Sequence, residues 1–592
     1  MTRNDLVIRV AGEAGEGIVS TGQLLTQAAL RGGFHVLTYS QPPSEIKGGH
    51  AFYQIRLNAY RSYSKGDSVD ILLAFNQEAY DRNAAETKDD GLLVYDPSEV
   101  TPSADSHFVQ VEFPLNDIAK NQLKFPIAKN VVAVGALAEL FGLPTKHLDS
   151  LIEERWLRKG EAVVQKNLDA LRAGIDYVIA NVPQRENFAL YPEKSHAGEI
   201  MVSGSEAIGL GAIAAGCGFM AGYPITPASD IKEFLEVHLP KTGGHALQAE
   251  DELAAIGMVL GASFAGSKAM TATSGPGFSL MIEMLGLAAM AELPCVIVDA
   301  QRAGPSTGMP TRHEQGDLYQ AAFAGHGECP RIVLAPTSVR DCFYQTVNAF
   351  NLAEKYQTPV ILLGDTLLNV RSESIPRPDL NEVAVIDRLL FSENGNGIGE
   401  DVGVGDEVGS MNGEYHRYVL TENGVSPMAV PGQEGGQYIA TGLEHNEEGL
   451  HRYDEATHTI MTQKRFRKLE RAALEAPEAD RFGNPDAEIG ILTWGSTVGS
   501  VIEVIRQAEE EGFELDMLAP RMLMPLPDHE LRPFIESKRV IIIPEVNYVG
   551  QFANMVSSQF PRDYVRINIF GGMPFRVDWL LEKIREEVAQ HV

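Results

Sequence analysis

The chain has little cysteine and no long apolar run. Its 592 residues include only four cysteines, and no two of them share a C-x-x-C spacing: Cys217, Cys295, Cys329 and Cys342. This scarcity excludes a disulfide framework and a cysteine-based zinc or cluster site in this chain. No run of about 18 consecutive apolar residues is present, so no transmembrane helix is expected. The first residues also lack the apolar region of a signal peptide, and the sequence predicts a cytoplasmic protein.

Basic residues are also scarce. Lysine and arginine together number 49 against 80 aspartates and glutamates, which gives a net charge of −31 at pH 7. Such a charge argues against nucleic acid and against an anionic membrane surface as partners. The hydrophobic fraction of 44% is ordinary for a globular protein. At roughly 150 residues per domain, the length predicts three or four domains.

Three segments of the chain show α/β patterning. Residues 1–190 begin with a strand, a glycine-containing loop, a helix and a second strand, followed by the runs DILLAF, GLLVYD and HFVQVEF. In residues 196–385 the short apolar runs AMTAT, CVIVDA and PVILLGD alternate with helical stretches. This alternation predicts a parallel sheet covered on both faces. Residues 486–592 form the third unit, with the strand-like runs EIGILTW and RVIIIPE.

A segment of different composition separates the second and third units. Residues 386–485 contain FSENGNGIGEDVGVGDEVGSMNGEY, which is acidic, rich in glycine and without apolar period. That composition predicts an exposed connection. The stretch TIMTQKRFRKLERAALEA, which follows, predicts a charged surface helix.

The stretch AGYPITPASDIKEFLEVHL allows two interpretations. A structural one places Thr226 as the N-cap and Pro227 at the first helical position of an amphipathic helix. A functional one notes that hydroxyl and free N–H groups before a helix can face a ligand. The pattern alone leaves both open.

Three acids, Glu250, Asp251 and Glu252, lie between a predicted strand and a predicted helix in HALQAEDELAAIGMVLGASFAG. Acids in a first helical turn complement the helix dipole, which accounts for most such clusters. Gly257 and Gly261 recur at helical spacing and predict a narrow face that a helix or cofactor can approach closely.

Two polar turns follow predicted strands. TSGPG ends the AMTAT strand and opens an apolar helix, which is weak evidence because glycine and proline occur in most turns. The loop QRAGPSTGMPTRHEQGDL follows CVIVDA and holds several polar side chains where α/β sheets bind ligands: Arg302, Ser306, Thr307, Thr311 and Arg312.

Together YPITP, the EDELAAIG helix start, TSGPG, QRAGPSTGMPT and the later EVNYVGQ resemble the α subunit of 2-oxoacid:ferredoxin oxidoreductases. The chain is similar to the form with a fused N-terminal γ domain, typical of 2-oxoglutarate:ferredoxin oxidoreductase. The resemblance implies three α/β domains: a γ domain (1–190) associated with coenzyme A, a thiamine diphosphate pyrimidine-binding domain (196–385) and a transketolase C-terminal-like domain (486–592). It implies thiamine-dependent decarboxylation of a 2-oxoacid to an acyl-CoA, with electrons passed to ferredoxin. For EVNYVGQ, packing or an interface is the expected role.

The resemblance assigns roles to residues of this sequence. Glu252 is the carboxylate expected against the aminopyrimidine ring of the cofactor, where it promotes proton transfer. Arg302 is expected to bind the substrate carboxylate, since a guanidinium can do so bidentately, with Thr226 and Thr311 as hydroxyl companions. The remaining cofactor contacts are expected from Tyr223, Pro224, Ile225, Ser274 and Gly275.

One thiamine motif is missing. Thiamine enzymes hold Mg²⁺ and the diphosphate with Gly-Asp-Gly followed by Asn, whereas this chain has four Gly-Asp pairs and no Gly-Asp-Gly: Gly66-Asp67, Gly316-Asp317, Gly364-Asp365 and Gly405-Asp406. No metal site is therefore expected in this chain. The resemblance implies a β subunit that carries Mg²⁺ and a [4Fe–4S] cluster, thiamine diphosphate shared between the subunits, an (αβ)₂ heterotetramer and ferredoxin as electron partner.

The N-terminal loop AGEAGEG is the last motif. Its order, G-x-x-G-x-G, differs from the dinucleotide fingerprint, and the second strand lacks the expected acid. The loop instead is similar to the glycine turn of γ domains. Lys47 and Lys129 are the residues expected, by charge, to meet a coenzyme A phosphate or the substrate carboxylate. Pyruvate or broad 2-oxoacid specificity, another half-site thiamine enzyme and a non-catalytic NAD-binding or scaffold protein remain as alternatives.

Overall fold

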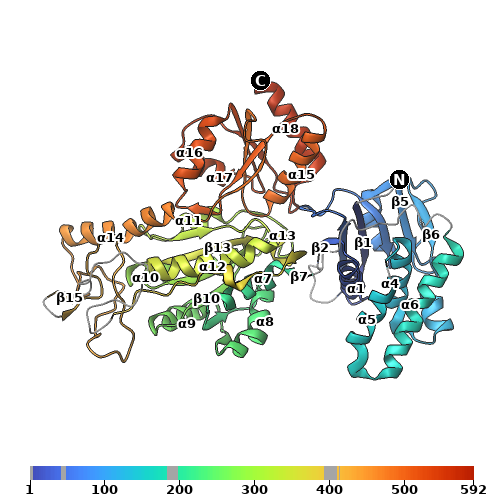
Figure 1. The fold of residues 1–592 in the computed structure, drawn as a ribbon, viewed down its shortest axis with the longest axis horizontal. Coiled ribbons are helices and arrows are strands. Elements are labelled where there is room, and N and C mark those ends of the chain that lie inside the picture. Colours follow the sequence, from blue (N-terminus) through green and yellow to red (C-terminus); the bar gives the residue numbers. More distant parts are fainter. Residues whose placement is uncertain are drawn as a thin grey trace. The chain divides into compact units, whose positions relative to one another are not determined.

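The computed structural model describes residues 5–41, 48–143, 145–182, 198–391, 410–411 and 414–591. The chain divides into two compact units, each described by itself below: Met1–Ser203 with Val370–Arg377 and Arg576–Asp578, and Gly204–Asn369 with Pro378–Phe575 and Trp579–Val592. The predicted class is confirmed, because three α/β domains are present, each built on a large sheet with helices around it (Figure 1). None of the described helices is long and apolar enough to cross a membrane.

The first unit is built on an eight-stranded sheet of order β6-β5-β4-β1-β3-β2-β14-β7. Strands β1, β4, β5 and β6 run parallel, while β3 is antiparallel to both β1 and β2. The strands are β1 (Asp5–Glu13), β2 (His35–Gln41), β3 (His50–Asn58), β4 (Val69–Ala74), β5 (Thr87–Tyr95), β6 (Val109–Glu112), β7 (Glu199–Ser203) and β14 (Ser372–Pro376). Strand β14 pairs with β2 and β7 although it lies more than 300 residues after β2.

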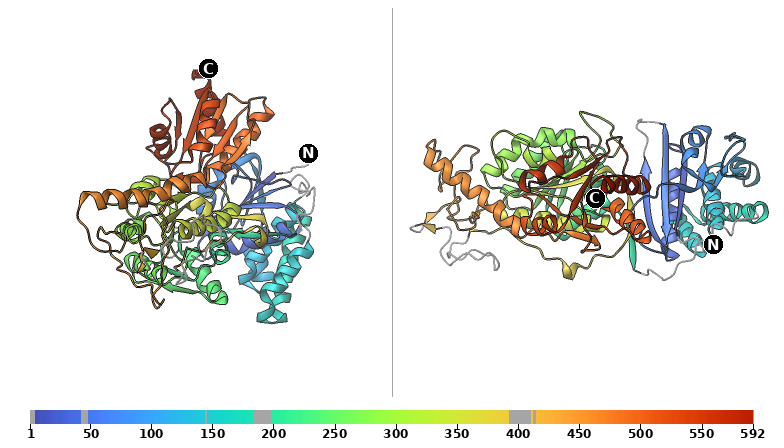
Figure 2. Two further views of the ribbon diagram at one scale, coloured as in Figure 1. Left: turned by 60° about the vertical axis from the view of Figure 1, so that its left-hand side comes forward. Right: turned by 90° about the horizontal axis from the view of Figure 1, so that it is seen from above.

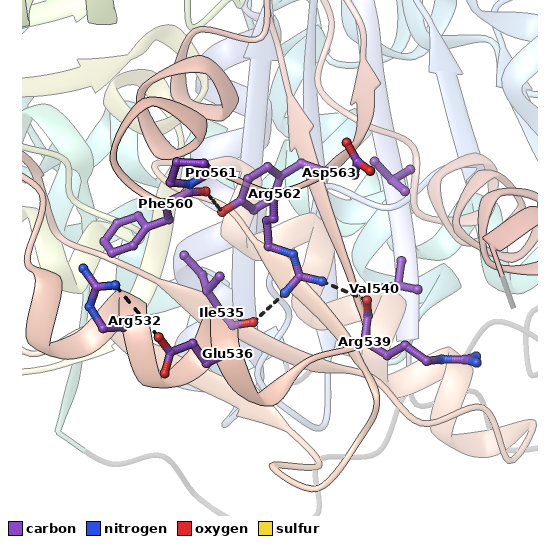
Figure 3. A pocket seen from close by; sticks show the side chains of 11 residues that line it. Arg532, Ile535, Glu536, Arg539, Val540, Phe560, Pro561, Arg562 and Asp563 are labelled. Carbon is purple, nitrogen blue, oxygen red and sulfur yellow. Dashed lines mark hydrogen bonds and ion pairs between the residues drawn. The ribbon is translucent and has the colours of Figure 1, made fainter.

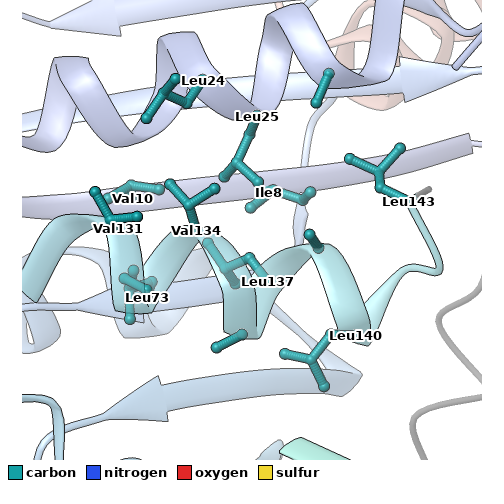
Figure 4. Packing of buried hydrophobic residues seen from close by; sticks show 14 of the residues in the cluster. Ile8, Val10, Leu24, Leu25, Leu73, Val131, Val134, Leu137, Leu140 and Leu143 are labelled. Atoms are coloured by element: carbon teal, nitrogen blue, oxygen red, sulfur yellow. The ribbon is translucent and has the colours of Figure 1, made fainter. Parts of the chain in front are cut away.

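Helices α1 (Ile18–Arg31), α4 (Lys129–Leu140), α5 (Thr145–Trp156) and α6 (Glu161–Asn181) belong to this unit. Helix α4 is apolar on nearly all sides, and its Val131 and Val134 side chains point toward Val10 and Ile8 of β1 in the core (Figure 4). Its other side meets α6 so closely that a Cβ at Gly135 would lie 2.1 Å from the carbonyl oxygen of Leu171. The run VVAVGALAEL is thus a buried central helix, as an all-round apolar pattern predicts.

The second unit contains a seven-stranded sheet of order β20-β12-β13-β11-β10-β8-β9. Strands β8 to β13 are mutually parallel, as the short apolar runs predict, and β20 is antiparallel at one edge. They are β8 (Phe219–Gly222), β9 (His245–Gln248), β10 (Ala269–Thr273), β11 (Cys295–Gln301), β12 (Ile332–Leu334), β13 (Pro359–Asp365) and β20 (Met522–Met524). The helices around this sheet include α7 (Gly204–Ala214), α8 (Ser229–His238), α9 (Glu252–Phe264), α10 (Gly275–Met290), α11 (Leu318–Phe323) and α12 (Val339–Tyr356).

One helix start differs from the structural interpretation of the YPITP stretch. Helix α8 begins at Ser229 with Ala228 as its N-cap, not at Pro227 with Thr226 as its cap. Thr226 and Pro227 therefore remain in the loop after β8. Ser229 donates its backbone N–H to the carbonyl oxygen of Ile225 at 2.9 Å, so the end of YPITP forms a turn that leads into the helix.

A five-stranded sheet of order β17-β19-β18-β21-β22 forms the other large part of the second unit (Figure 2). Strands β19, β18, β21 and β22 are parallel and β17 is antiparallel to β19. Its elements are β17 (Asp480–Gly483), β18 (Ile489–Leu492), β19 (Asp516–Ala519), β21 (Val540–Glu545), β22 (Val565–Asn568), α15 (Thr497–Glu510), α16 (Asp528–Ser537), α17 (Gln551–Gln559) and α18 (Val577–His591).

The segment between the two sheets was predicted as an exposed connection and a surface helix. Most of the glycine-rich stretch, 392–409 and 412–413, lies outside the described residues. The surface-helix prediction is wrong for one face of α14 (Glu455–Leu474), because Lys464 and Lys468 are only 1% and 2% exposed. Both ammonium groups donate to the carboxylate of Glu292, each at 2.5 Å. The helix is thus attached to the sheet domain by buried charges.

This buried cluster contains one anion and three cations, since the charge of Arg417 also acts on Glu292. Burial by itself raises the pKa of Glu292, but the three cations outweigh burial and hold that pKa well below its usual range. Burial also lowers the pKa of Lys464 to about 7. Glu292 is therefore the only negative charge that compensates the three buried cations of the cluster.

We expect Glu292→Gln to lower the free energy of unfolding by about 3 kcal/mol or more, because it leaves buried cations without their counter-charge. Lys464→Met is the matched variant, and we expect a much smaller loss because Glu292 keeps Lys468 and Arg417. Urea denaturation at pH 7 measures both. Equal losses in the two variants would contradict this account.

Candidate functional site

The candidate site lies at the carboxyl ends of four adjacent parallel strands, in the order β9-β8-β10-β11. The chain passes from β8 to β9 on one side and from β10 to β11 on the other. The strand order therefore reverses between β8 and β10, which is where open α/β sheets bind ligands. The loops at these ends contain YPITP, the acid cluster, TSGPG and the long polar loop.

Glu252 is the first residue of α9 and is 6% exposed. The preceding residue, Asp251, caps the helix by accepting the backbone N–H of Ala254 at 2.7 Å. Among the described residues no hydrogen bond or ion pair to the Glu252 carboxylate is found. A Cβ at Gly277 would lie 2.5 Å from Glu252 Oε1 and 2.1 Å from Thr273 Oγ1, so the carboxylate packs against the first turn of α10. It is a buried acid without a hydrogen-bonding partner among the described residues.

Ser274 and Gly275 start α10. Ser274 occupies the N-cap position, yet its hydroxyl makes no cap hydrogen bond and is buried without a partner among the described residues. Gly275 is buried too, and a Cβ there would lie 2.7 Å from Asp317 Oδ2. The first turn of a helix also has free N–H groups. This turn therefore offers unused donors close to Glu252.

Arg302 follows the last residue of β11 and is 8% exposed. Its Nη1 donates to the carbonyl oxygen of Thr226 at 2.8 Å, while its Nε–H is buried without a partner. The structure thus brings Arg302 to the YPITP loop through the backbone of Thr226. The Thr226 side chain is exposed, and Thr311 lies partly buried in the loop that follows Arg302.

The first three residues of YPITP lie at or near the surface, whereas Pro227 is buried. Tyr223 is 41% exposed, Pro224 is exposed and Ile225 is partly buried. Their exposure leaves this part of the loop accessible to a ligand or a partner.

Two acids that sequence reasoning left out of the site also lie here. Asp299, on β11, is fully buried and neither of its carboxylate oxygens has a partner among the described residues. Burial raises the pKa of Asp299 well above its usual value, and the charge of Asp317 adds to that shift. Burial, assisted by Glu314, also raises the pKa of Asp317 to about 6, while Arg302 opposes the shift. In the sequence, Asp317 stands in an incomplete Gly-Asp-Gly motif. The signal for Asp299 is that it is the one charged residue in the apolar run CVIVDA.

One expectation for α9 is not met within this chain. The Gly257 and Gly261 face was expected to be approached closely, but a Cβ at Gly261 would meet no atom within 4 Å and one at Gly257 only Met284 Cε at 3.9 Å. The described residues leave this face open because none of their helices packs across it.

In the first unit, the side chain of Glu16 binds the backbone of the N-terminal glycine loop. Glu16 Oε2 accepts the backbone N–H of Glu13 at 2.8 Å and Asn76 Nδ2 at 2.9 Å. Glu16 Oε1 lies 3.4 Å from Lys129 Nζ, which also lies 4.6 Å from the centroid of the Phe75 ring. Lys129 therefore already has a carboxylate partner, and Lys47 lies outside the described residues.

A pocket of about 610 Å³ lies elsewhere, between α16 and the first residues of β21 and β22 (Figure 3). Arg562 fills one wall and donates to the carbonyl oxygens of Ile535 and Arg539 at 2.6 and 2.8 Å. Because Val540 and Val565 begin their strands, the pocket is at the amino ends of this parallel sheet. It is separate from the loops described above. Among the described residues no group of three or more His, Cys, Asp or Glu side chains is arranged to hold a metal ion.

In a comparison with known proteins, all three domains match families of ferredoxin or flavodoxin oxidoreductases. Residues 7–177 match the family described as pyruvate ferredoxin/flavodoxin oxidoreductase, and residues 210–465 match the thiamine diphosphate-binding family of pyruvate flavodoxin/ferredoxin oxidoreductase. Residues 487–577 match core domain II of pyruvate:ferredoxin oxidoreductase. The 2-oxoacid:ferredoxin oxidoreductase α subunit of a Sulfolobus species is 33% identical, over 97% of this chain and 96% of that one. The chain belongs to the 2-oxoacid:ferredoxin oxidoreductase α-subunit family.

Two further relatives carry more specific names. The 2-oxoglutarate oxidoreductase subunit KorA of Mycobacterium tuberculosis is 31% identical, over 99% of this chain and 92% of that one. A solved structure of 2-oxoglutarate:ferredoxin oxidoreductase from Magnetococcus marinus, with 2-oxoglutarate, coenzyme A and succinyl-CoA bound, is 40% identical. It superimposes with a TM-score of 0.91 and covers 99% of this chain and 100% of that one. The family resemblance derived from YPITP and QRAGPSTG is therefore confirmed.

We expect Gly277→Ala to raise the dissociation constant for thiamine diphosphate at least about tenfold, because the added methyl group displaces Glu252 from the first turn of α10. Gly286→Ala, on the same helix, adds its methyl group to open space and is the control. Titration of the purified enzyme with cofactor measures both constants. Similar values for the two variants would show that Glu252 is not held in this way.

Proposed function

We propose that this chain is the α subunit of a 2-oxoglutarate:ferredoxin oxidoreductase. The reaction is the thiamine-dependent oxidative decarboxylation of 2-oxoglutarate to succinyl-CoA with electrons to ferredoxin, or the reverse reductive carboxylation. The observation that supports it most directly is the buried, unpartnered carboxylate of Glu252 at the reversal of strand order, in a domain of the thiamine diphosphate-binding family. The name and bound compounds of the Magnetococcus marinus neighbour support the choice of substrate.

The residues present fit thiamine diphosphate. When bound, the cofactor supplies a thiazolium carbon that attacks the keto group of the substrate. Glu252 has the role of holding a proton at the aminopyrimidine ring nitrogen, and its burial excludes water that would compete for that hydrogen bond. Ser274, Gly275 and the loop Tyr223–Ile225 are the proposed walls of the cofactor site.

Arg302 is the proposed anchor for the substrate carboxylate. One nitrogen of its guanidinium is used by the Thr226 carbonyl, which fixes the plane of the group. The buried Nε–H remains available, so a carboxylate can bind along that edge by two parallel hydrogen bonds. Thr226 and Thr311 are the proposed hydroxyl neighbours of the substrate.

The α-subunit family implies a partner, and we propose a β subunit that carries Mg²⁺ and a [4Fe–4S] cluster in an (αβ)₂ heterotetramer. Exposed apolar side chains on β9, α9 and α10 offer a surface for it: Leu247, Leu253, Met258 and Leu280, each between 42% and 51% exposed. Ferredoxin is proposed to dock on the β subunit. Coenzyme A is proposed to bind the γ domain, with Lys47 and Lys129 as its cationic contacts, in the case of Lys129 after release from Glu16.

Co-expression with the β subunit tests the assignment through 2-oxoglutarate- and coenzyme A-dependent reduction of a viologen dye. We expect turnover from the complex only, and a loss of about 10²- to 10⁴-fold in kcat for Glu252→Gln because proton transfer at the cofactor is lost. Glu250→Gln changes an exposed acid two residues away and is the control. Undiminished turnover by Glu252→Gln would overturn the assignment of the carboxylate.

The same assay with pyruvate tests the substrate. The family descriptions name pyruvate, so pyruvate or broad 2-oxoacid specificity is the second candidate. A kcat/KM for pyruvate equal to or above that for 2-oxoglutarate would favour it.

A further inference from the structure

The EVNYVGQ segment has a defined structural role at the end of β21. The carboxylate of Glu545 is fully buried and accepts the backbone N–H groups of Phe552 and Ala553, each at 2.9 Å. It also accepts Asn547 Nδ2 at 2.9 Å. These bonds fix the turn between β21 and α17 in one conformation.

That turn holds a segment of the thiamine-binding domain. Asn547 Nδ2 donates to the carbonyl oxygen of Gln315 at 3.1 Å, and Gln551 Nε2 donates to that of Gly316 at 2.7 Å. Gln551 Oε1 accepts the N–H of Tyr319 at 2.8 Å. Residues 315–319 are thus bound on both sides of Asp317. The position of Asp317 is set by the EVNYVGQ turn.

Asp317 lies against the first turn of α10, on which Glu252 also packs. Its backbone N–H donates to Gln301 Oε1 at 2.9 Å, and its carboxylate lies beside Gly275. The Oδ2 atom is buried and without a partner among the described residues. The bonds described above hold the backbone in place, but they leave this oxygen unused.

Four titratable groups lie near Asp317 or on the same helix turn. Asp299 lies on β11, Arg302 and Glu314 lie in the loop after it, and Glu252 lies across the first turn of α10. Arg302 is the one cation among them, and its charge and that of Asp317 act on each other without forming an ion pair. The Arg302 guanidinium, which is proposed to bind the substrate, therefore has the carboxylate of Asp317 nearby.

We propose that Asp317 is a positioning counter-charge for Arg302, which sets how tightly the site holds the carboxylate of a 2-oxoacid. This inference rests on the proposed function. An ionised Asp317 offsets the positive charge that attracts the substrate, whereas a protonated Asp317 leaves that charge in full. Because the pKa of Asp317 is about 6, the charge is present at neutral pH and is lost in mild acid.

The experiment compares wild-type and Asp317→Asn complexes by the dye assay between pH 5.5 and 8. At pH 8 we expect the KM for 2-oxoglutarate to be about fivefold lower in Asp317→Asn, because a repulsive charge near the carboxylate is removed, and kcat to change less than KM. In the wild type KM should rise as the pH increases through about 6, whereas in the variant it should stay flat. Glu328→Gln, an exposed acid before the amino end of β12, is the charge-matched control.

A structural role alone would lower kcat and the unfolding temperature together and leave the pH profile of KM unchanged. An unchanged or increased KM for Asp317→Asn at pH 8, in a complex whose wild type turns over, overturns this inference only. If the variant folds poorly, the pH dependence of the wild-type KM for 2-oxoglutarate tests the inference instead. A wild-type KM that does not rise between pH 6 and 8 also overturns the inference. Absence of turnover in the wild-type complex overturns the proposed function and this inference with it.

Discussion

The first turn of α10 lies between two buried carboxylates, and this close packing determines the geometry of the whole site. Glu252 meets the turn at Gly277 and Asp317 meets it at Gly275, and neither contact would leave room for a Cβ. A carboxylate near a helix N-terminus is favoured by the free N–H groups and by the helix dipole. For Asp317 this effect does not outweigh burial, because its pKa is raised to about 6. The glycines of TSGPG are explained by these two contacts.

The site also depends on the contact between the two sheets of the second unit. Asn547 and Gln551 come from the five-stranded sheet, but their hydrogen bonds end on the loop that follows β11 of the seven-stranded sheet. The domain built on the five-stranded sheet thus contributes no side chain to the proposed chemistry and still fixes the position of Asp317, near Arg302. Buried amide side chains that both donate and accept hydrogen bonds are well suited to this, since they specify a single arrangement.

Much of this could be predicted from local patterns. The strands follow from short apolar runs, and the positions of Glu252 and Arg302 follow from the rule that carboxyl ends of parallel strands meet at one edge. The capping interpretation of Thr226-Pro227 satisfies a local rule, but α8 begins two residues later than this rule indicates. The burial of Lys464 could not be read from a charged helix, because its partner Glu292 lies 172 residues earlier in the chain. The same holds for Asp299 and Asp317, whose proximity is a product of the fold.

The sheet of the first unit is completed by a strand that the ribosome makes more than 300 residues after the strand it pairs with. Val36 on β2 donates to Ser374 on β14, 338 residues further along the chain. At about 5–20 residues per second, synthesis leaves the edge of β2 without this neighbour for roughly 20 to 70 s. An unpaired strand edge is a template for pairing with another chain, so the nascent protein passes through a period in which this edge needs protection. Fusion of the N-terminal unit to the thiamine-binding domain therefore delays its completion until most of the chain has been made.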